Sequence, residues 1–159
     1  MGHYDVAQIC MKGHVINESV KGFPERSKKF CPQCGSPTII NCPKCNTHIQ
    51  GVFYEEEDVY DPYYTVPWFC QNCGAPFPWA EAKLKAAHEF AQSLAISKEE
   101  KKTLEESIDD IVITTATTAA SANKFRTILS KAGKTAFETG KEVLTDILSE
   151  TAKKIIFGG

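Results

Sequence analysis

Four pairs of potential metal ligands follow one another in the first half of the chain, and their spacing is typical of zinc sites. The pairs contain all seven cysteines and one histidine: Cys10 and His14, Cys31 and Cys34, Cys42 and Cys45, and Cys70 and Cys73. In a Cys-x-x-Cys pair, a tight turn brings both sulfur atoms to one ion. Gly35 and Gly74 follow two of these turns and supply backbone freedom, while Pro32 and Pro43 make the turns more rigid.

Eight ligands fill two tetrahedral sites with none left over, which predicts two zinc ions. Neighbouring pairs would form a first site of Cys10, His14, Cys31 and Cys34, and a second site of Cys42, Cys45, Cys70 and Cys73. A cross-braced arrangement would instead join the first pair to the third and the second to the fourth. Seven residues, 35–41, separate the two central pairs and favour the sequential arrangement, because cross-braced domains usually place these pairs nearly adjacent.

The zinc in such sites would be structural, because four protein ligands leave no position for a reactive water molecule. The spacing of the remaining residues shows no Ser–His–Asp, Cys–His or paired-carboxylate arrangement. A redox motif or free core thiols would not explain three Cys-x-x-Cys pairs without a βαβ pattern. His48 could compete as a ligand because it follows Cys45 by three residues, but a surface position is favoured for it. We therefore expect no enzymatic activity.

The composition changes near Pro78–Trp79 and divides the chain into two halves. All eight prolines occur by residue 78, and the following residues are mainly Ala, Lys, Glu, Thr, Leu and Ile. The predicted class is α+β, with a first zinc ribbon at 1–40, a second at 41–79 and an all-α region of about four helices at 80–159. Zinc substitutes for the hydrophobic core that such small ribbons cannot build.

Short strands should lie between the ligand pairs, at 15–16, 38–40 and 48–54, with 65–69 as the hairpin partner of 48–54. The connection between these last two, 55–62, is acidic and long for a hairpin. Helices are predicted at 80–95, after the capping box of Ser97 and Glu100, around Phe125 and from about residue 134 to the end. Gly133 is expected to separate the last two of them.

Charge and hydropathy limit the classes of partner. The net charge is −2, and residues 1–79 carry 6 basic against 8 acidic residues, which counts against nucleic acid. Nucleic-acid binding stays an alternative that would require Lys12, Lys21, Lys28, Lys29 and Lys44 on one surface. No apolar run of 18 residues and no secretion signal occurs, so the expected compartment is the cytoplasm.

Two features leave more than one interpretation open. The aromatic and acidic stretch Tyr54–Trp68 could recognise a basic partner, although covering the zinc sites is the favoured role. The apolar stripes of the C-terminal helices could pack together, form a homo-oligomer or bind a partner helix. Contact with a membrane surface is disfavoured, because acidic residues such as Glu138 and Glu142 dilute the lysines of the polar faces.

The N-terminal half also resembles a known family. The resemblance rests on residues 2–10, Gly13–Asn17, Phe30-Cys31 and the motif Phe69-Cys70-x-x-Cys73-Gly74-x-Pro76-x-Pro78-Trp79. The family consists of uncharacterised bacterial proteins, described as a domain of unknown function with tandem zinc ribbons, and the similarity covers about residues 1–80. It implies a bacterial zinc-ribbon protein and no particular activity. The expected function is therefore that of an adaptor or scaffold, with a zinc-ribbon head that recognises a protein and a helical tail that mediates assembly.

Overall fold

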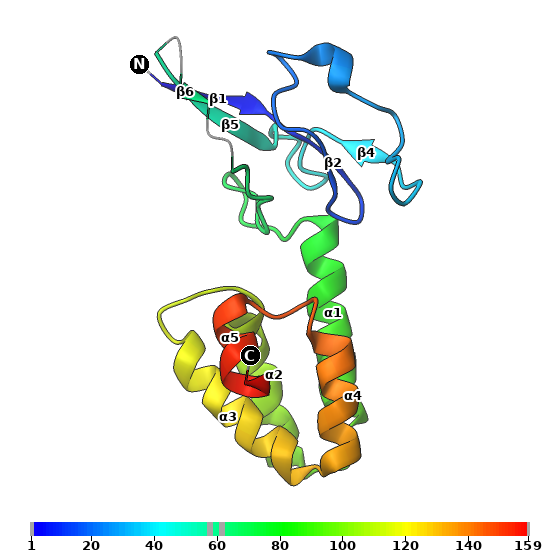
Figure 1. Cartoon of the computed structure of the whole chain (residues 1–159), viewed down its shortest axis with the longest axis vertical. Helices are drawn as coiled ribbons and strands as arrows, with labels where there is room; N and C mark the ends of the chain where they lie inside the picture. Colours follow the sequence, from blue (N-terminus) through cyan, green and yellow to red (C-terminus); the bar gives the residue numbers. More distant parts are fainter. Residues whose placement is uncertain (1, 57–58, 61–62, 159) are drawn as a thin grey trace. The chain divides into compact units, whose positions relative to one another are not determined.

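The computed structural model describes residues 2–56, 59–60 and 63–158, and it confirms the α+β class. Short antiparallel strands occupy the N-terminal part, and helices follow (Figure 1). The chain divides into two compact units, Met1–Glu81 and Ala82–Gly159, which are called the head and the helical unit below. Each unit has its own buried core, and each is described by itself.

The head contains two small antiparallel sheets. Their strands are β1 (His3–Val6), β2 (Gln8–Cys10), β3 (Val15–Asn17), β4 (Thr38–Ile39), β5 (Gln50–Glu55) and β6 (Val59–Tyr60), with a 3-10 turn at Pro24–Arg26. One sheet has the order β1-β5-β6 and the other β3-β2-β4. Because β1 pairs with β5, the predicted segments 1–40 and 41–79 share a sheet. The head therefore folds as one unit around both groups of cysteines.

The strand predictions were correct in part. Strands occur near 15–16, 38–40 and 48–54, but β1 and β2 were not predicted. The expected hairpin of 48–54 with 65–69 was wrong, because β5 pairs with β1 and β6. Residues 65–69 form no regular strand, and the Tyr64 hydroxyl just before them donates a hydrogen bond of 2.6 Å to the Gln50 carbonyl. The predicted connection 55–62 lies partly outside the described residues.

A compact hydrophobic core joins the two sheets of the head. Its buried members are Ala7, Ile9, Cys42, Ile49, Cys70, Phe77, Trp79 and Ala80. The rings of Phe77 and Trp79 stack at 4.9 Å, and the Trp79 indole N–H donates a hydrogen bond of 2.8 Å to the Pro67 carbonyl. Two cysteines belong to this core, so a metal bound by them would be continuous with the packing of the head.

The remaining elements are helices: α1 (Pro78–Ser93), α2 (Lys98–Val112), α3 (Thr118–Lys131), α4 (Lys134–Leu144) and α5 (Glu150–Phe157). The Ser97 hydroxyl caps α2 by accepting a hydrogen bond from the Glu100 amide, as the capping box predicts. The prediction of one long final helix was wrong. Ser149 caps α5 by accepting a hydrogen bond from the Ala152 amide, and this cap begins a separate helix after α4.

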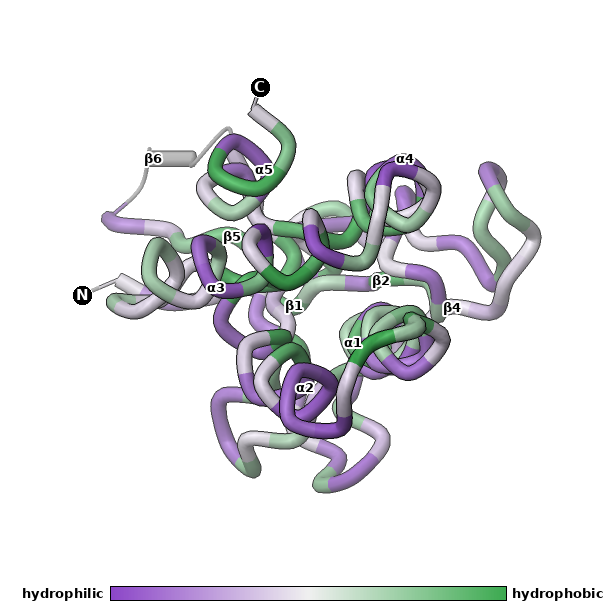
Figure 2. The backbone as a smooth tube through the Cα atoms, turned by 90° about the horizontal axis from the view of Figure 1, so that it is seen from below, coloured by the Kyte–Doolittle hydropathy of each residue, from purple (hydrophilic) through white to green (hydrophobic). Residues whose placement is uncertain are grey.

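The helical unit buries its apolar stripes internally. Helix α3 packs against α2, α4 and α5, and α5 also contacts α2. The buried side chains include Leu104, Ile108, Ile111, Phe125, Leu129, Leu144 and Ile156. Figure 2 shows hydrophilic and hydrophobic residues alternating around these helices. Among the described residues, no helix combines the length and hydrophobicity needed to cross a lipid bilayer.

Candidate metal centres

The first cluster brings together Cys10, His14, Cys31 and Cys34 from two separate segments. Strand β2 ends at Cys10, the turn that follows supplies His14, and the first Cys-x-x-Cys turn supplies the other two residues. The Sγ atoms of Cys10 and Cys34 are 3.8 Å apart. His14 directs Nδ1 into the group, at 3.4 Å from the Sγ atom of Cys10 and 3.6 Å from that of Cys31.

The second cluster brings together Cys42, Cys45, Cys70 and Cys73. The Sγ atoms of Cys42 and Cys73 are 3.7 Å apart, and those of Cys45 and Cys70 are 3.6 Å apart. Both clusters therefore join ligand pairs that are neighbours in the sequence. This is the sequential arrangement and not the cross-braced one.

The turns of the three Cys-x-x-Cys pairs share one backbone design. The amide two residues after each first cysteine points at its sulfur, as from Gln33 to Cys31 at 3.4 Å. The residue after each second cysteine adopts a positive φ: 73° at Gly35, 73° at Gly74 and 64° at Asn46. Asparagine tolerates this conformation better than most residues, which explains why the second turn forms without glycine.

Hydroxyl groups distinguish the second cysteines of the three turns. The Ser36 side chain, with Oγ 3.3 Å from the sulfur of Cys34, lowers the pKa of Cys34 to about 6. The Thr47 side chain has the same position at the next turn and lowers the pKa of Cys45 to about 6. Since the thiolate is the metal ligand, these hydroxyls favour the deprotonated form of Cys34 and Cys45 that binds a metal ion. These hydroxyls were not predicted from the sequence, although a Ser or Thr two residues after the second cysteine of a turn can be recognised there.

Cys73 lacks this support because Ala75 occupies the corresponding position. The Ala75 backbone amide lowers the pKa of Cys73, but desolvation and the neighbouring thiols outweigh it and raise the pKa to about 11. Cys73 is also an exposed residue, whereas Cys70 of the same turn is buried. The two clusters therefore differ in how strongly the metal-free protein favours the thiolate form of their cysteines.

The spacing of the donor atoms fits a tetrahedral zinc ion. Zinc–sulfur bonds of about 2.3 Å place two sulfur ligands about 3.8 Å apart, and a sulfur and a nitrogen ligand about 3.6 Å apart. The distances within the clusters are 3.6–3.8 Å between sulfur atoms and 3.4–3.6 Å from sulfur to nitrogen. Disulfide bonds would require about 2.05 Å, and all seven cysteines are free. Each cluster could therefore hold one metal ion, and the donor set is that of zinc.

The other histidine raised as a candidate ligand lies outside both clusters. His48 is exposed, and its Nδ1 atom is 2.6 Å from the side-chain oxygen of Asn41. This contact across the isolated bridge of Asn41 and His48 gives the imidazole a structural partner. The arrangement supports a surface position for His48 and leaves the second cluster with four sulfur donors.

The comparison with protein families accounts for almost the whole chain. Residues 3–156 match the model of a family described as "Uncharacterized protein conserved in bacteria (DUF2321)". The chain belongs to this family. The match confirms the resemblance found in residues 1–80 and extends it across the helical unit. No curated protein and no solved structure matches the chain.

Proposed function

We propose that this member of DUF2321 is a non-catalytic adaptor whose head is held together by two structural zinc ions and recognises another protein. The four-donor composition of each cluster supports the structural role, because a tetrahedral ion bound by four residues has no open position. Since Cys42 and Cys70 belong to the hydrophobic core, loss of the ion would disturb the packing of the head.

The observation that carries the recognition role is the uneven exposure of large apolar side chains. Among the described residues, nine such side chains are exposed, and eight lie in the head: Tyr4, Met11, Val15, Phe23, Phe30, Phe53, Tyr63 and Phe69. The ninth, Val143, belongs to the helical unit. Aromatic residues and methionine are enriched at protein interfaces, so the head is the part of the chain best suited to contact a partner.

The helical unit supports a different role. Its apolar stripes are largely used in packing α3 against its neighbours, which favours the internal bundle among the three interpretations of these helices. We assign assembly of the adaptor to this unit, with Val143 as its exposed apolar contact. Light scattering of the purified chain tests this assignment. A monomer at all concentrations would contradict it, and a Val143→Asp variant should shift an oligomer towards the monomer.

Partner recovery from bacterial cells tests the recognition role. The tagged full chain is cross-linked and purified beside a variant with five head aromatics replaced by serine: Tyr4, Phe30, Phe53, Tyr63 and Phe69. We expect this variant to retain its metal and lose a protein that the original chain recovers, whereas Val143→Ser keeps that protein. Recovery of the same proteins by both variants would contradict the proposal. Salt-sensitive recovery of nucleic acid in place of protein would support the alternative partner class.

A further inference from the structure

A hollow on one face of the sheet β1-β5-β6 has a markedly aromatic lining. Its volume is about 260 Å³, and Tyr4, Phe53, Tyr63, Tyr64 and Pro67 line it together with residues 50–52 and Thr65. We call this hollow the aromatic groove. All of these residues belong to the head, and both metal clusters lie outside the lining.

Strand pairing places two of the rings at the base of the groove. Tyr4 of β1 lies opposite Phe53 of β5, and their rings meet edge to face at 4.9 Å. The side chains are nevertheless 52% and 38% exposed, respectively, so much of their ring surface is available to a ligand. Two adjacent aromatic rings held by paired strands form a contact surface that loses little conformational entropy on binding.

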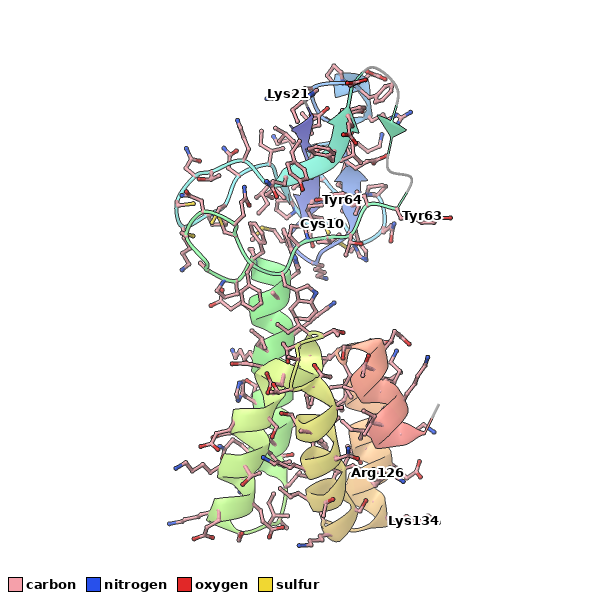
Figure 3. The ribbon with its side chains drawn as sticks, turned by 90° about the vertical axis from the view of Figure 1, so that its left-hand side faces the viewer. Cys10, Lys21, Tyr63, Tyr64, Arg126 and Lys134 are labelled. Atoms are coloured by element: carbon pink, nitrogen blue, oxygen red, sulfur yellow. The ribbon has the colours of Figure 1, made fainter. Side chains whose placement is uncertain are left out.

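The opposite wall comes from the segment that follows the sheet. Tyr64 is anchored because its hydroxyl donates a hydrogen bond of 2.6 Å to the Gln50 carbonyl. Burial, with a smaller effect of the Glu18 charge, raises the pKa of Tyr64 and keeps this hydroxyl protonated. The adjacent Tyr63 is 82% exposed and extends away from the head (Figure 3). The hydrogen bond of Tyr64 therefore holds this wall in place, and the exposed ring of Tyr63 lies at the edge of the groove.

The dimensions and charge of the aromatic groove select among possible occupants. An α-helix, about 10 Å wide with its side chains, is too large for a groove of about 260 Å³. A peptide cannot add to β5 as a further strand, because β5 is already paired with β1 and β6. None of the described lining residues is basic, which disfavours the phosphates of a nucleic acid. Glu55 is exposed on the same strand face as Phe53, so positive charge is favoured beside the groove.

We propose that the aromatic groove binds a proline-rich peptide segment, in polyproline II conformation, that carries an arginine or lysine beside its prolines. Proline rings fill slots between aromatic side chains, and the peptide carbonyls accept hydrogen bonds from tyrosine hydroxyls. Proline has no amide hydrogen, so it needs few acceptors from the site. This proposal rests on the adaptor function and names the class of protein segment that the head would recognise.

Fluorescence anisotropy with defined peptides tests the proposal on the full-length, metal-loaded chain. The probes are a panel of fluorescein-labelled twelve-residue peptides with proline at two of every three positions and arginine at either end. Matched peptides carry alanine for proline or glutamate for arginine. We expect saturable binding of the proline–arginine peptides and at least tenfold weaker binding of both matched sets.

Variants of the head locate the binding site. Tyr4→Ala, Phe53→Ala and Tyr63→Ala should each weaken binding about tenfold, and Glu55→Lys should weaken it and reduce its salt dependence. Phe23→Ala is the matched control, because Phe23 is 37% exposed on the head, does not line the groove and is not among the five aromatics replaced above. Its affinity should stay within about twofold of the original. Tyr63→Ala keeps the test valid even if a strand variant folds poorly, because its side chain is largely in solvent.

Several results would overturn the proposal: no saturable binding across the panel, equal binding of the alanine peptides, or equal weakening by Phe23→Ala. Binding of oligo(dT) that depends on Tyr4 and exceeds peptide binding would replace it with single-strand recognition. Failure of the adaptor function gives a different result, because the five-residue variant would then recover the same proteins as the original chain. If the five-residue variant loses a protein partner while Tyr4→Ala and Phe53→Ala keep it, the head recognises a protein through another surface and only the groove proposal fails.

Discussion

The hydroxyl of Ser19 donates a hydrogen bond of 2.7 Å to the carboxylate of Asp5, and both residues are buried in the head. The same carboxylate accepts hydrogen bonds from the backbone amides of Val6, Lys21 and Gly22. Burial opposes the charge of Asp5, but these hydrogen bonds outweigh it and keep its pKa below the ordinary value. Asp5 therefore fastens the segment after β3 to strand β1.

Replacing Asp5 with asparagine should destabilise the head by about 3 kcal/mol, because a neutral amide cannot satisfy four donors that converge on a charged acceptor. Denaturant unfolding of the head, followed by tryptophan fluorescence, measures this change. Glu25→Gln removes the same charge at an exposed position and should change the stability by less than about 0.5 kcal/mol.

The pH dependence of this variant follows from the direction of the pKa shift. Since the pKa of Asp5 is lowered, its stabilising contribution is complete above the ordinary pKa of about 4 and disappears as the pH falls through the lower value. Protonation of the cysteines would release zinc before that range is reached. The stability difference between Asp5→Asn and the original chain should therefore be constant from about pH 6 to pH 9. A difference that grows or shrinks across this range would contradict a lowered pKa.

Removing one ligand from either cluster should unfold the head and spare the helices. We expect Cys31→Ser and Cys70→Ser each to reduce the metal content from two ions per chain, because a site with three donors holds zinc much more weakly. Far-ultraviolet circular dichroism should retain the helical signal, since the helical unit has a separate core. Loss of the helical signal would show that the two units depend on each other.

His48→Ala is the matched control for these cysteine variants. The residue follows Cys45 closely in the sequence but lies outside the second cluster. Its replacement should leave both metal ions bound, as measured by elemental analysis of the purified chain. Loss of one ion from His48→Ala would instead identify the histidine as a ligand and contradict the four-sulfur assignment.

The candidate ligands could be identified from the sequence because a Cys-x-x-Cys turn is a local structure, and its spacing already determines how two sulfur atoms converge. Strand β1 could not be identified in the same way. Its exposed residues Tyr4 and His3 give no clear alternation, and its stability comes from pairing with β5, nearly fifty residues later in the chain. The wrong partner for β5 has the same origin, because residues 65–69 have the composition of a strand but contact the core as an irregular segment.

The helices show a similar limit. Ser97 and Glu100 form a recognised capping box, so the beginning of α2 could be predicted. Ser149 also caps a helix but has no Glu or Gln three residues later, and the apolar stripe continues on both sides of it. The division between α4 and α5 depends on tertiary contact as well: the Ser149 amide donates a hydrogen bond of 3.0 Å to the Ile111 carbonyl at the end of α2.

The hydroxyls beside the clusters should tune metal affinity. Ser36→Ala removes the hydroxyl next to Cys34 and should weaken zinc binding at the first cluster about tenfold. Ala75→Ser introduces a hydroxyl at the matching position beside Cys73 and should strengthen binding at the second cluster. Competition with a chromophoric chelator measures both affinities. Equal affinities in the original chain and both variants would show that these hydroxyls do not influence the metal.

The independence of the two units can be tested from the helical side. Leu129 is fully buried in α3, so Leu129→Ala should destabilise the helical unit by about 3 kcal/mol through lost packing and the cavity left behind. Arg126→Ala, at an exposed residue of the same helix, should change the stability by less than about 0.5 kcal/mol. Thermal unfolding followed by circular dichroism measures both effects, while elemental analysis should still find two metal ions per chain. If Leu129→Ala also releases metal from the head, the units unfold as one, and the clusters depend on more than the packing around Cys42 and Cys70.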